Sequence, residues 1–261
     1  MISGAPHRTR ILLLGGTAEA RQLAERIADD PRFDAILSLA GRTAHPELPA
    51  IAVRIGGFGG VDGLSSYLTR EKINVVLDAT HPFAAHISAN AVAACLRSRV
   101  TLMALERPPW QHQAGDDWIH HTTVEDAIAA LPRAPMRIFS GLGRLSLDAM
   151  SAAPHHYFVI RVIDPLAAPL PLPGYSVIHA RGPFKTEDDI ALFREHKIEA
   201  ILAKNAGGNA AVSKIDAARA LGLPVHMIDR PAIPPREVVT HVEQALARLA
   251  DHHASPANRG V

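Results

Sequence analysis

Short apolar runs alternate with longer segments of helical period along most of the chain. Residues 11–14 form a continuous apolar run, which is the pattern of a strand buried on both faces. The segment that follows, residues 18–29, has Leu23, Ala24 and Ile27 on one helical face. In the first half of the chain, the same reasoning predicts strands over residues 33–40, 51–55, 74–77 and 101–104, and helices over residues 61–70 and 82–97.

A second series of strands and helices starts after the proline-rich segment 131–135. Strands are predicted over residues 137–140, 157–163, 176–179, 200–203 and 225–228, and helices over a short segment ending at residue 150 and over residues 187–196, 211–221 and 236–250. Strands and helices that alternate at this spacing predict parallel sheets covered on both faces, with right-handed crossovers. We therefore expect an α/β fold with two domains, residues 1–133 and residues 134–261.

The first strand runs into Gly15-Gly16-Thr17 and then into a helix. Backbone N–H groups and the positive end of the helix meet there, where a phosphate can bind. Gly15, Thr17 and Ala20 occupy the three positions of the dinucleotide fingerprint, with Thr17 in place of the second glycine. Because a glycine pair at a strand end is often only a turn, the loop alone leaves both interpretations open.

The end of the second strand carries Gly41-Arg42-Thr43 and no acidic residue. An acid at this place usually binds the ribose 2′-hydroxyl of NAD, whereas Arg42 could bind a 2′-phosphate and Thr43 could add a hydroxyl. A solvated arginine is the alternative. A third glycine loop, residues 56–60, follows the next strand and supplies three more candidate cofactor-binding residues: Gly57, Phe58 and Gly59. Three such loops at one sheet edge predict NADP(H) as the ligand.

Polar side chains also follow the fourth strand, at Asp78, Thr80 and His81. This edge of the sheet faces the place where a nicotinamide would lie. We therefore predict these three residues as catalytic-site residues, with His81 as a proton donor or as a group that orients a substrate carboxylate. The alternative is that Asp78 and Thr80 only cap the helix that Pro82 begins.

Lys204 and Lys214 lie near a glycine pair and a helix N-terminus in the second half of the chain. They could bind carboxylates or phosphates, or they could belong to a solvated loop. Trp110 follows the fifth strand in a loop, as a packing element or as a stacking surface. The sequence contains neither the Tyr-x-x-x-Lys pair of short-chain dehydrogenases nor the Gly-x-Ser-x-Gly elbow of hydrolases. It also lacks the histidine motifs that bind metals, so we expect no bound metal.

The composition limits the remaining classes of function. The net charge is +1, which gives no electrostatic case for general nucleic-acid binding. No apolar run approaches the roughly 18 residues that a membrane span needs. The sequence holds 1 cysteine, Cys95, which fits a reducing compartment. We expect a cytoplasmic protein that binds neither nucleic acid nor membrane.

Taken together, these motifs resemble the precorrin-6A reductase family of cobalamin biosynthesis. The similarity runs from about residue 10 to residue 250. The matching stretches are residues 11–21, 78–84, 106–110, 182–184, 214–218 and 222–231. The combination of Gly-Gly-Thr-x-Glu-Ala at residues 15–20 with Asp-Ala-Thr-His-Pro at residues 78–82 is more specific than either glycine loop.

The resemblance implies two Rossmann-like domains with parallel sheets and a cleft between them. It implies an NADPH-dependent oxidoreductase that transfers a hydride to C19 of precorrin-6A and gives precorrin-6B. Glu19 joins the cofactor-binding residues on the same grounds. The substrate is an anionic, tetrapyrrole-derived macrocycle, so cations and an aromatic side chain are expected to bind it. The predicted substrate-binding residues are Arg107, Trp110, Arg161, Lys204 and Lys214.

Three other functions stay open at this point. The first is the cobalt-precorrin-6A reductase of the anaerobic pathway, where NADH can serve as donor. The second is a module that senses NADP(H) without catalysis, although the cationic loops of the second half argue against it. The third is a pathway methyltransferase, in which Arg42 would have no natural use.

Overall fold

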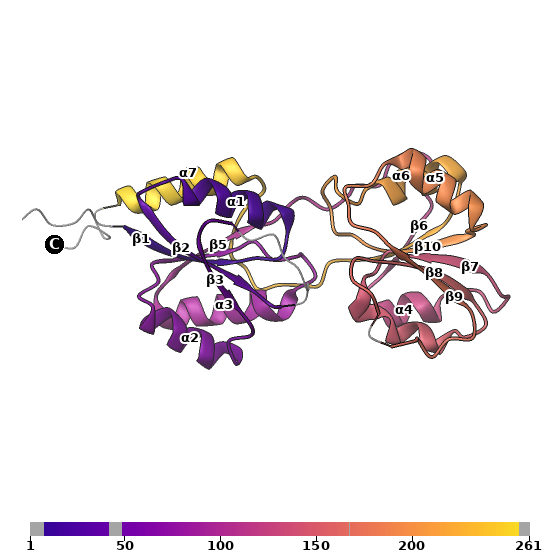
Figure 1. Cartoon of the computed structure of the whole chain (residues 1–261), viewed down its shortest axis with the longest axis horizontal. Coiled ribbons are helices and arrows are strands. Elements are labelled where there is room, and N and C mark those ends of the chain that lie inside the picture. The colour runs from indigo at the N-terminus through magenta and orange to yellow at the C-terminus, as the bar shows by residue number, and fades with distance from the viewer. Residues whose placement is uncertain (1–7, 42–48, 167, 256–261) are drawn as a thin grey trace, which may run out of the picture. The chain divides into compact units, whose positions relative to one another are not determined.

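The computed structural model describes residues 8–41, 49–166 and 168–255, and it divides the chain into two compact units. Unit 1 consists of Met1–Arg107 and Ala232–Val261, and unit 2 consists of Pro108–Pro231. Each unit is one sheet with helices on both of its faces (Figure 1). Among the described helices, none is long and apolar enough to cross a membrane.

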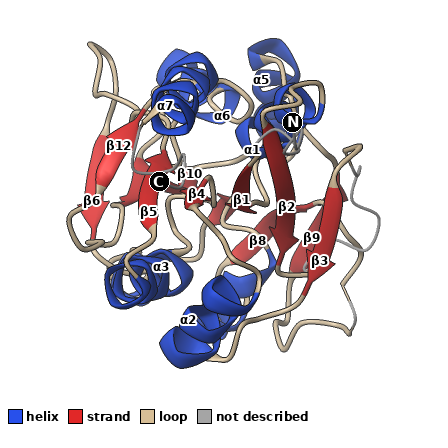
Figure 2. Ribbon diagram, turned by 90° about the vertical axis from the view of Figure 1, so that its left-hand side faces the viewer, coloured by secondary structure: helices blue, strands red, loops and turns tan. Residues whose placement is uncertain are grey.

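The sheet of unit 1 has six parallel strands. They are β1 (Thr9–Leu14), β2 (Phe33–Leu39), β3 (Ala52–Ile55), β4 (Val75–Asp78), β5 (Thr101–Leu105) and β12 (Glu237–Val239), in the spatial order β12-β5-β4-β1-β2-β3. The helices are α1 (Ala18–Ala28), α2 (Gly60–Arg70), α3 (Ala85–Ser98) and α7 (Val242–Ala254). α1 and α7 cover one face of the sheet, and α2 and α3 cover the other (Figures 1 and 2).

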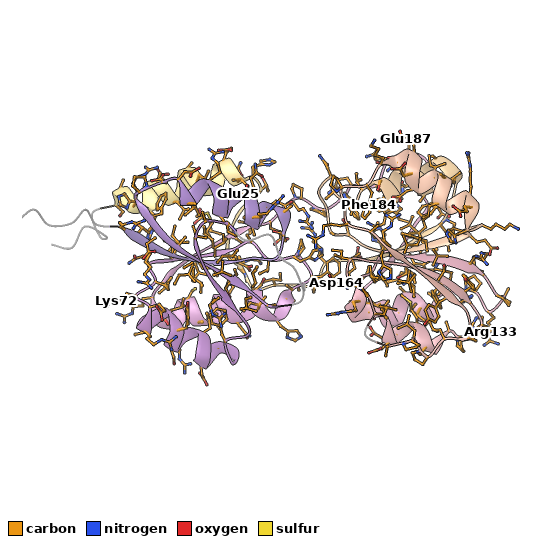
Figure 3. All side chains as sticks on the ribbon, viewed as in Figure 1. Glu25, Lys72, Arg133, Asp164, Phe184 and Glu187 are labelled. Atoms are coloured by element: carbon orange, nitrogen blue, oxygen red, sulfur yellow. The ribbon has the colours of Figure 1, made fainter. Side chains whose placement is uncertain are left out.

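Unit 2 repeats this architecture. Its strands are β6 (Trp118–His121), β7 (Arg137–Ser140), β8 (Tyr157–Val162), β9 (Tyr175–His179), β10 (Ala200–Lys204) and β11 (Val225–Ile228), in the parallel order β6-β11-β10-β7-β8-β9. Its helices are α4 (Val124–Ala129), α5 (Thr186–Glu195) and α6 (Ser213–Leu221), and two short 3₁₀ helices, Arg144–Ser146 and Asp148–Ala152, follow β7. Glu187 on α5 points to solvent, as does Glu25 on α1 (Figure 3).

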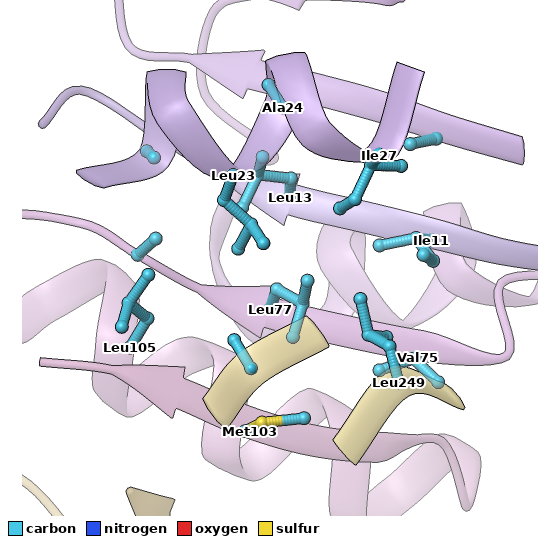
Figure 4. Close-up of a cluster of buried hydrophobic side chains, with 14 of the residues drawn as sticks. Ile11, Leu13, Leu23, Ala24, Ile27, Val75, Leu77, Met103, Leu105 and Leu249 are labelled. Carbon is cyan, nitrogen blue, oxygen red and sulfur yellow. The ribbon is translucent and has the colours of Figure 1, made fainter. Parts of the chain in front are cut away.

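The apolar run of β1 explains why this strand lies inside its sheet. Successive side chains of a strand point to opposite faces. Ile11 and Leu13 pack with α1 and α7 in one core cluster (Figure 4), and Leu12 and Leu14 pack with α2 and α3 in another. All four side chains are buried, so a strand with two apolar faces joins both helical layers to the sheet.

The predicted α/β fold with parallel sheets in two units is confirmed, but the chain passes between the units at other positions. Arg133, where we predict the first domain to end, lies inside unit 2 (Figure 3). The reason is an exchange of edge strands. β6 pairs with β11 in unit 2, and β12 pairs with β5 in unit 1. The prolines that mark the true crossings are Pro108-Pro109 and those of residues 231–235.

Some element boundaries also differ from the predicted ones. β6, α4 and β12 are not predicted, and the terminal helix begins at Val242 rather than at residue 236. The helix predicted from residue 82 begins at Ala85, because Pro82 and Phe83 form a turn. The short helix predicted before residue 150 consists of the two 3₁₀ helices.

Candidate functional site

The order of the strands determines where a ligand can bind in unit 1. β1 and β4 are neighbours, while β2 lies on the far side of β1 and β5 on the far side of β4. The connections from these two strands therefore run in opposite directions, which leaves a crevice at their carboxyl ends. The loops at this place are those that start at Gly15 and at Ala79.

The loop after β1 is held in place at both ends. Gly15 N–H donates to the Ser38 carbonyl at 2.9 Å, and a Cβ at Gly15 would lie 2.6 Å from Leu37 Cδ1. Gly16 has a φ of +120°, and no atom lies within 4 Å of the place that a Cβ would take. The backbone at Gly16 is therefore open to a close approach by a ligand.

Thr17 connects this loop to two neighbouring elements. Its hydroxyl accepts from Ala20 N–H at 3.1 Å, which caps α1, and it donates to the Ala79 carbonyl at 2.8 Å. The N-terminus of α1 is thereby fixed at the crevice, with its positive dipole end exposed to a ligand. Ala20 lies on the buried face of α1, so it contributes to packing rather than to direct contact with a ligand.

Two further glycine segments lie at the same edge of the sheet. Gly41 follows β2, is exposed and has a φ of +73°. Arg42 and Thr43 lie outside the described residues. Gly57 and Gly59 precede α2, and a Cβ at either would meet nothing within 4 Å. Gly59 is the N-cap residue of α2, with a φ of +81° and no side-chain cap. The N-terminal N–H groups of α2 are thus unoccupied by a capping side chain.

Arg54 on β3 organises this second loop, and the sequence analysis does not identify it. Its guanidinium donates to the carbonyls of Gly56 at 3.0 Å and Gly57 at 2.9 Å, and to Ser38 Oγ at 2.7 Å. It also stacks on Phe58, with 3.8 Å between Cζ and the ring centroid. Arg54 therefore joins the end of β2, the glycine loop and the start of α2. The role of Arg54 could have been predicted from its position, because an arginine lies there between two strand ends and a glycine loop.

These features fit a bound dinucleotide. Gly16 gives a bare backbone, α1 gives a capped helix N-terminus at the switch point, and the loop at Gly57–Gly59 gives a second open backbone. Phosphates bind at such helix N-termini. The residues predicted from the first glycine loop thus come together with those of the third loop at one sheet edge.

Asp78, Thr80 and His81 lie at the carboxyl end of β4. Asp78 is 3% exposed, and its Oδ1 accepts from Thr80 Oγ1 at 2.7 Å and from Thr80 N–H at 3.2 Å. His81 Nδ1 accepts from Phe83 N–H at 3.2 Å. The N-cap of α3 is Ala84, and no side chain caps it. The alternative that Asp78 and Thr80 cap this helix is therefore wrong.

A narrow pocket opens beside these residues. It lies between the ends of β4 and β5 and the segment that leads into β12. Its lining residues are Asp78, Thr80, His81, Pro82, Ser88, Leu105, Glu106, Ile233 and Arg236. All of them belong to unit 1, and their polar groups dominate its surface.

Arg107 and Glu19 form an ion pair. Arg107 Nη1 lies 2.9 Å from Glu19 Oε2, and the two side chains are 17% and 30% exposed. We predict Arg107 as a substrate-binding residue and Glu19 as a cofactor-binding residue. The structure brings the two together within unit 1 and balances the charge of Arg107.

The carboxyl edge of unit 2 collects lysines and an aromatic ring. Lys204 Nζ, at the end of β10, donates to Ser146 Oγ at 2.9 Å and to the Leu142 carbonyl at 3.3 Å. Lys214 Nζ, on α6, lies 4.7 Å from the centroid of the Trp110 ring. Lys204, Lys214 and Trp110 therefore lie in one unit, as three of the predicted substrate-binding residues.

Asn205 fixes Trp110 in this arrangement, and sequence reasoning does not identify it. Its Oδ1 accepts from Trp110 N–H at 2.8 Å, and its Nδ2 donates to the Trp110 carbonyl at 3.1 Å. The indole Nε1 donates to the Gly208 carbonyl at 2.8 Å. The Trp110 ring is consequently fixed by the loop after β10. The signal is the asparagine that follows Lys204 at a strand end.

Arg161 has different contacts from these lysines. Its guanidinium pairs with Asp189, whose other hydrogen bond comes from Ser213 Oγ at 2.6 Å. The rings of Phe139 and Phe184 lie 4.8 Å and 4.2 Å from its Cζ. The side chains of Arg161 and Asp189 are 10% and 2% exposed. Arg161 thus belongs to a buried, charge-balanced cluster.

Within the described part of the chain, no three histidine, cysteine, aspartate or glutamate side chains are grouped as metal ligands would be. The fold and the edge of unit 1 define a Rossmann-like α/β protein of two units, in which the first unit has the features of a dinucleotide site.

Comparison with known proteins gives the family. The chain belongs to the family described as precorrin-6x reductase CbiJ/CobK, whose model matches residues 10–250. This confirms the resemblance stated from the sequence motifs. The precorrin-6A reductase of Rhodobacter capsulatus is 52% identical over 97% of this chain and 100% of its own length. The cobalt-precorrin-6A reductase of Priestia megaterium is 28% identical over 94% of this chain and 100% of its own.

A solved structure agrees with this assignment. The structure of CobK precorrin-6A reductase superposes with a TM-score of 0.89 at 52% identity, and it covers 97% of this chain and 100% of the solved one. The fold of two Rossmann-like units is therefore that of the family.

Proposed function

We propose that this protein reduces precorrin-6A to precorrin-6B in cobalamin biosynthesis, by transferring a hydride from NADPH to C19 of the macrocycle. The observation that carries the proposal is the capped N-terminus of α1 at the switch point, behind a glycine loop with an open backbone. The 52% identity with a precorrin-6A reductase over nearly the whole chain supports the substrate.

The cofactor would be held by the loops of unit 1. Gly15, Gly16 and Thr17 would bind the pyrophosphate through backbone N–H groups, and Glu19 and Ala20 would hold the first turn of α1 in place. The reduced nicotinamide supplies the hydride. Accurate placement of the donor against the target carbon would be most of the catalysis.

The preference for NADPH over NADH rests on the ends of β2 and β3. Residues 38–41 contain no acid that could bind a ribose 2′-hydroxyl. Arg54 places a cation beside Ser38, 2.7 Å from its hydroxyl. Arg42 and Thr43 remain predicted 2′-phosphate ligands, while Gly41, Gly57, Phe58 and Gly59 would line the adenosine half.

Asp78, Thr80 and His81 would form the reactive edge of unit 1. Asp78 and Thr80 share a hydrogen bond that fixes both side chains at the end of β4. His81 is partly exposed and would orient the substrate or supply a proton. We expect His81→Ala to lower turnover while leaving NADPH affinity nearly unchanged.

Lys204, Lys214 and Trp110 would bind the carboxylates and one face of the macrocycle. Arg107 and Arg161 already have carboxylate partners, Glu19 and Asp189. These two arginines stay in the predicted substrate-binding set, with their charges balanced within the protein. We place the activity in the cytoplasm, as the single cysteine and the short apolar runs of the sequence indicate.

The test is an assay of the purified protein with NADPH and three additions: precorrin-6A, its cobalt form and buffer. Oxidation of NADPH with precorrin-6A alone is the expected result. Turnover of the cobalt form alone would favour the anaerobic reaction. Tight NADPH binding without turnover of either substrate would favour a sensing module and contradict the proposal.

A further inference from the structure

Two buried polar atoms in the pocket of unit 1 have no hydrogen-bond partner. One is Asp78 Oδ2, an acceptor, and the other is Arg236 Nε, a donor. Asp78 is 3% exposed, and the Arg236 side chain is 8% exposed. Both residues line the same pocket. Buried polar groups are nearly always paired in native proteins, so two of opposite type in one place require an explanation.

A second polar atom of each residue already has a partner. Asp78 Oδ1 takes both bonds from Thr80. Arg236 Nη2 donates to Glu106 Oε2 at 2.6 Å, which fixes the guanidinium against the end of β5. The two side chains are therefore held by neighbours, and each has one buried atom without a hydrogen-bond partner. A fixed acceptor and a fixed donor of this kind are a preorganised pair.

The position of the pocket indicates its ligand. The pocket lies at the carboxyl ends of β4 and β5, on the half of the sheet beyond the switch point. With the pyrophosphate at the N-terminus of α1 and the adenosine toward β2 and β3, the nicotinamide half of a dinucleotide extends toward β4 and β5. The group that enters this pocket must donate to Asp78 and accept from Arg236.

We infer that Asp78 and Arg236 bind the carboxamide of the nicotinamide. Its NH₂ group donates to Asp78 Oδ2, and its carbonyl oxygen accepts from Arg236 Nε–H. A primary carboxamide carries one donor group and one acceptor, which match the two unused atoms. Held at both ends, the carboxamide fixes the rotation of the ring and hence the face from which the hydride leaves.

The pocket as it stands has no room for a further group. The wall formed by Ile233 belongs to an irregular segment, residues 229–236, that can adjust without breaking a helix or strand. Entry of the carboxamide requires this wall to move outward. Catalytic-site hydrogen bonds commonly form only in the liganded state.

This inference rests on the proposed cofactor, so its experiment uses two ligands. We would measure Kd for NADP⁺ and for 2′-phospho-ADP-ribose, which lacks the nicotinamide, with the wild type and with Asp78→Asn and Arg236→Lys. In Asp78→Asn the amide oxygen can keep the bonds from Thr80, and its NH₂ group then faces the NH₂ group of the ligand. We expect each variant to bind NADP⁺ roughly tenfold more weakly and to bind the fragment within about twofold of wild type.

Matched controls are Asp62→Asn and Arg248→Lys, whose side chains are 88% and 60% exposed. They should leave both affinities unchanged. A third ligand, the 3-acetylpyridine analogue of NADP⁺, has a methyl group in place of NH₂. The wild type should bind it more weakly than NADP⁺, and Asp78→Asn should remove most of that difference.

The outcomes separate the two proposals. Equal loss of NADP⁺ and fragment binding would make the pair structural and overturn the inference. Unchanged NADP⁺ affinity in both variants would overturn it as well. A wild type that binds neither ligand would contradict the proposed cofactor itself. Retained fragment binding shows that a variant is folded.

Discussion

The two units have the same strand order, yet their carboxyl edges differ. In unit 1, β1 passes through two glycines directly into α1, an α-helix of 11 residues capped by Thr17. In unit 2, the corresponding strand β7 passes through Gly141 and Gly143 into 3₁₀ helices of 3 and 5 residues. A long α-helix presents a dipole and free N–H groups at its start, whereas such short 3₁₀ turns do not. After the central strand, unit 1 therefore presents the N-terminus of an α-helix, whereas unit 2 presents only 3₁₀ turns.

Two lysines and a tryptophan lie at the carboxyl edge of unit 2. Lys204 is the last residue of β10, the strand beside β7, and Lys214 lies over Trp110. One cation at the equivalent edge of unit 1, Arg107, pairs with Glu19. Under the proposed function, the loops after the strands, rather than the order of the strands, would divide the binding of cofactor and substrate between the two units.

The sharpest test of this difference between the units replaces one glycine by valine in the loop after β1 or in the loop after β7. Gly16 has a φ of +120° and Gly143 a φ of +78°, and neither has an atom near the place of a Cβ. Gly16→Val should strain the loop and place a side chain where the phosphate would bind, so NADPH affinity should fall roughly 100-fold, or about 2.7 kcal/mol. Binding is measured by titration of the purified variants.

Gly143→Val is the control, because it imposes similar backbone strain in unit 2. It should leave NADPH affinity within about twofold of wild type. Circular dichroism melting would show whether each variant is folded. Equal losses in both variants would mean that the difference between the two edges does not select the cofactor site.

The second test addresses the charges of unit 2. Lys204→Ala removes the ammonium group that Ser146 and the Leu142 carbonyl hold. Since hydrogen bonds to charged groups contribute about 1.5–3 kcal/mol, KM for precorrin-6A should rise roughly 10- to 100-fold with the Kd of NADPH unchanged. Lys185→Ala, at an exposed lysine of the same unit, should change neither constant. A rise in the Kd of NADPH alone would assign Lys204 to the cofactor.

Much of unit 1 could be predicted because its signals are local. The run of residues 11–14 identifies a central strand, and the turn at Gly15 to Thr17 identifies the helix start. β6 and β12 could not be predicted from the sequence because they are edge strands of only 4 and 3 residues. Their place depends on pairing with β11 and β5, which lie about a hundred or more residues away.

The partners of the cations could not be predicted either. Arg161 looks like a free cation in the sequence, and Asp189, 28 positions further on, neutralises it only in the fold. Arg54 looks like a polar residue on a strand, and its role requires the ring of Phe58 to pack beneath it. Sequence identifies the charged residue, whereas the partner depends on tertiary structure.

The third test asks how much the adenosine side of unit 1 depends on Arg54. Arg54→Ala removes two hydrogen bonds to the glycine loop and the stack on Phe58. The loop should lose its fixed geometry, and NADPH affinity should fall roughly tenfold. Arg70→Ala is a matched control, because its guanidinium lies 5.2 Å from the Tyr67 ring and donates to Glu71 rather than to the loop. If Arg54→Ala binds NADPH like the wild type, the loop is held by other contacts.

The smallest expected effect is a pH dependence of unit 2 that comes from a pair of histidines. His121 Nε2 and His226 Nδ1 lie 3.0 Å apart on neighbouring strands, and the two rings are stacked. Burial lowers the pKa of His226, and the charge of His121 lowers it further; burial also lowers the pKa of His121. The strands β5 and β12 at the equivalent edge of unit 1 contain no histidine.

The sign follows from these lowered values. In the unfolded chain the two histidines bind protons near pH 6.5, about the ordinary pKa of histidine. In the folded protein they bind protons only at lower pH, because their pKa values are lowered. The stability that these histidines contribute is therefore fully present above that value and is lost as the pH falls toward the folded pKa values.

Both tryptophans of the chain, Trp110 and Trp118, lie in unit 2, so their fluorescence during urea unfolding at pH 8 and pH 5 reports this unit. His226→Gln should reduce the loss of stability between these two pH values. If the variant loses as much stability as the wild type, the pH dependence of unit 2 comes from other groups.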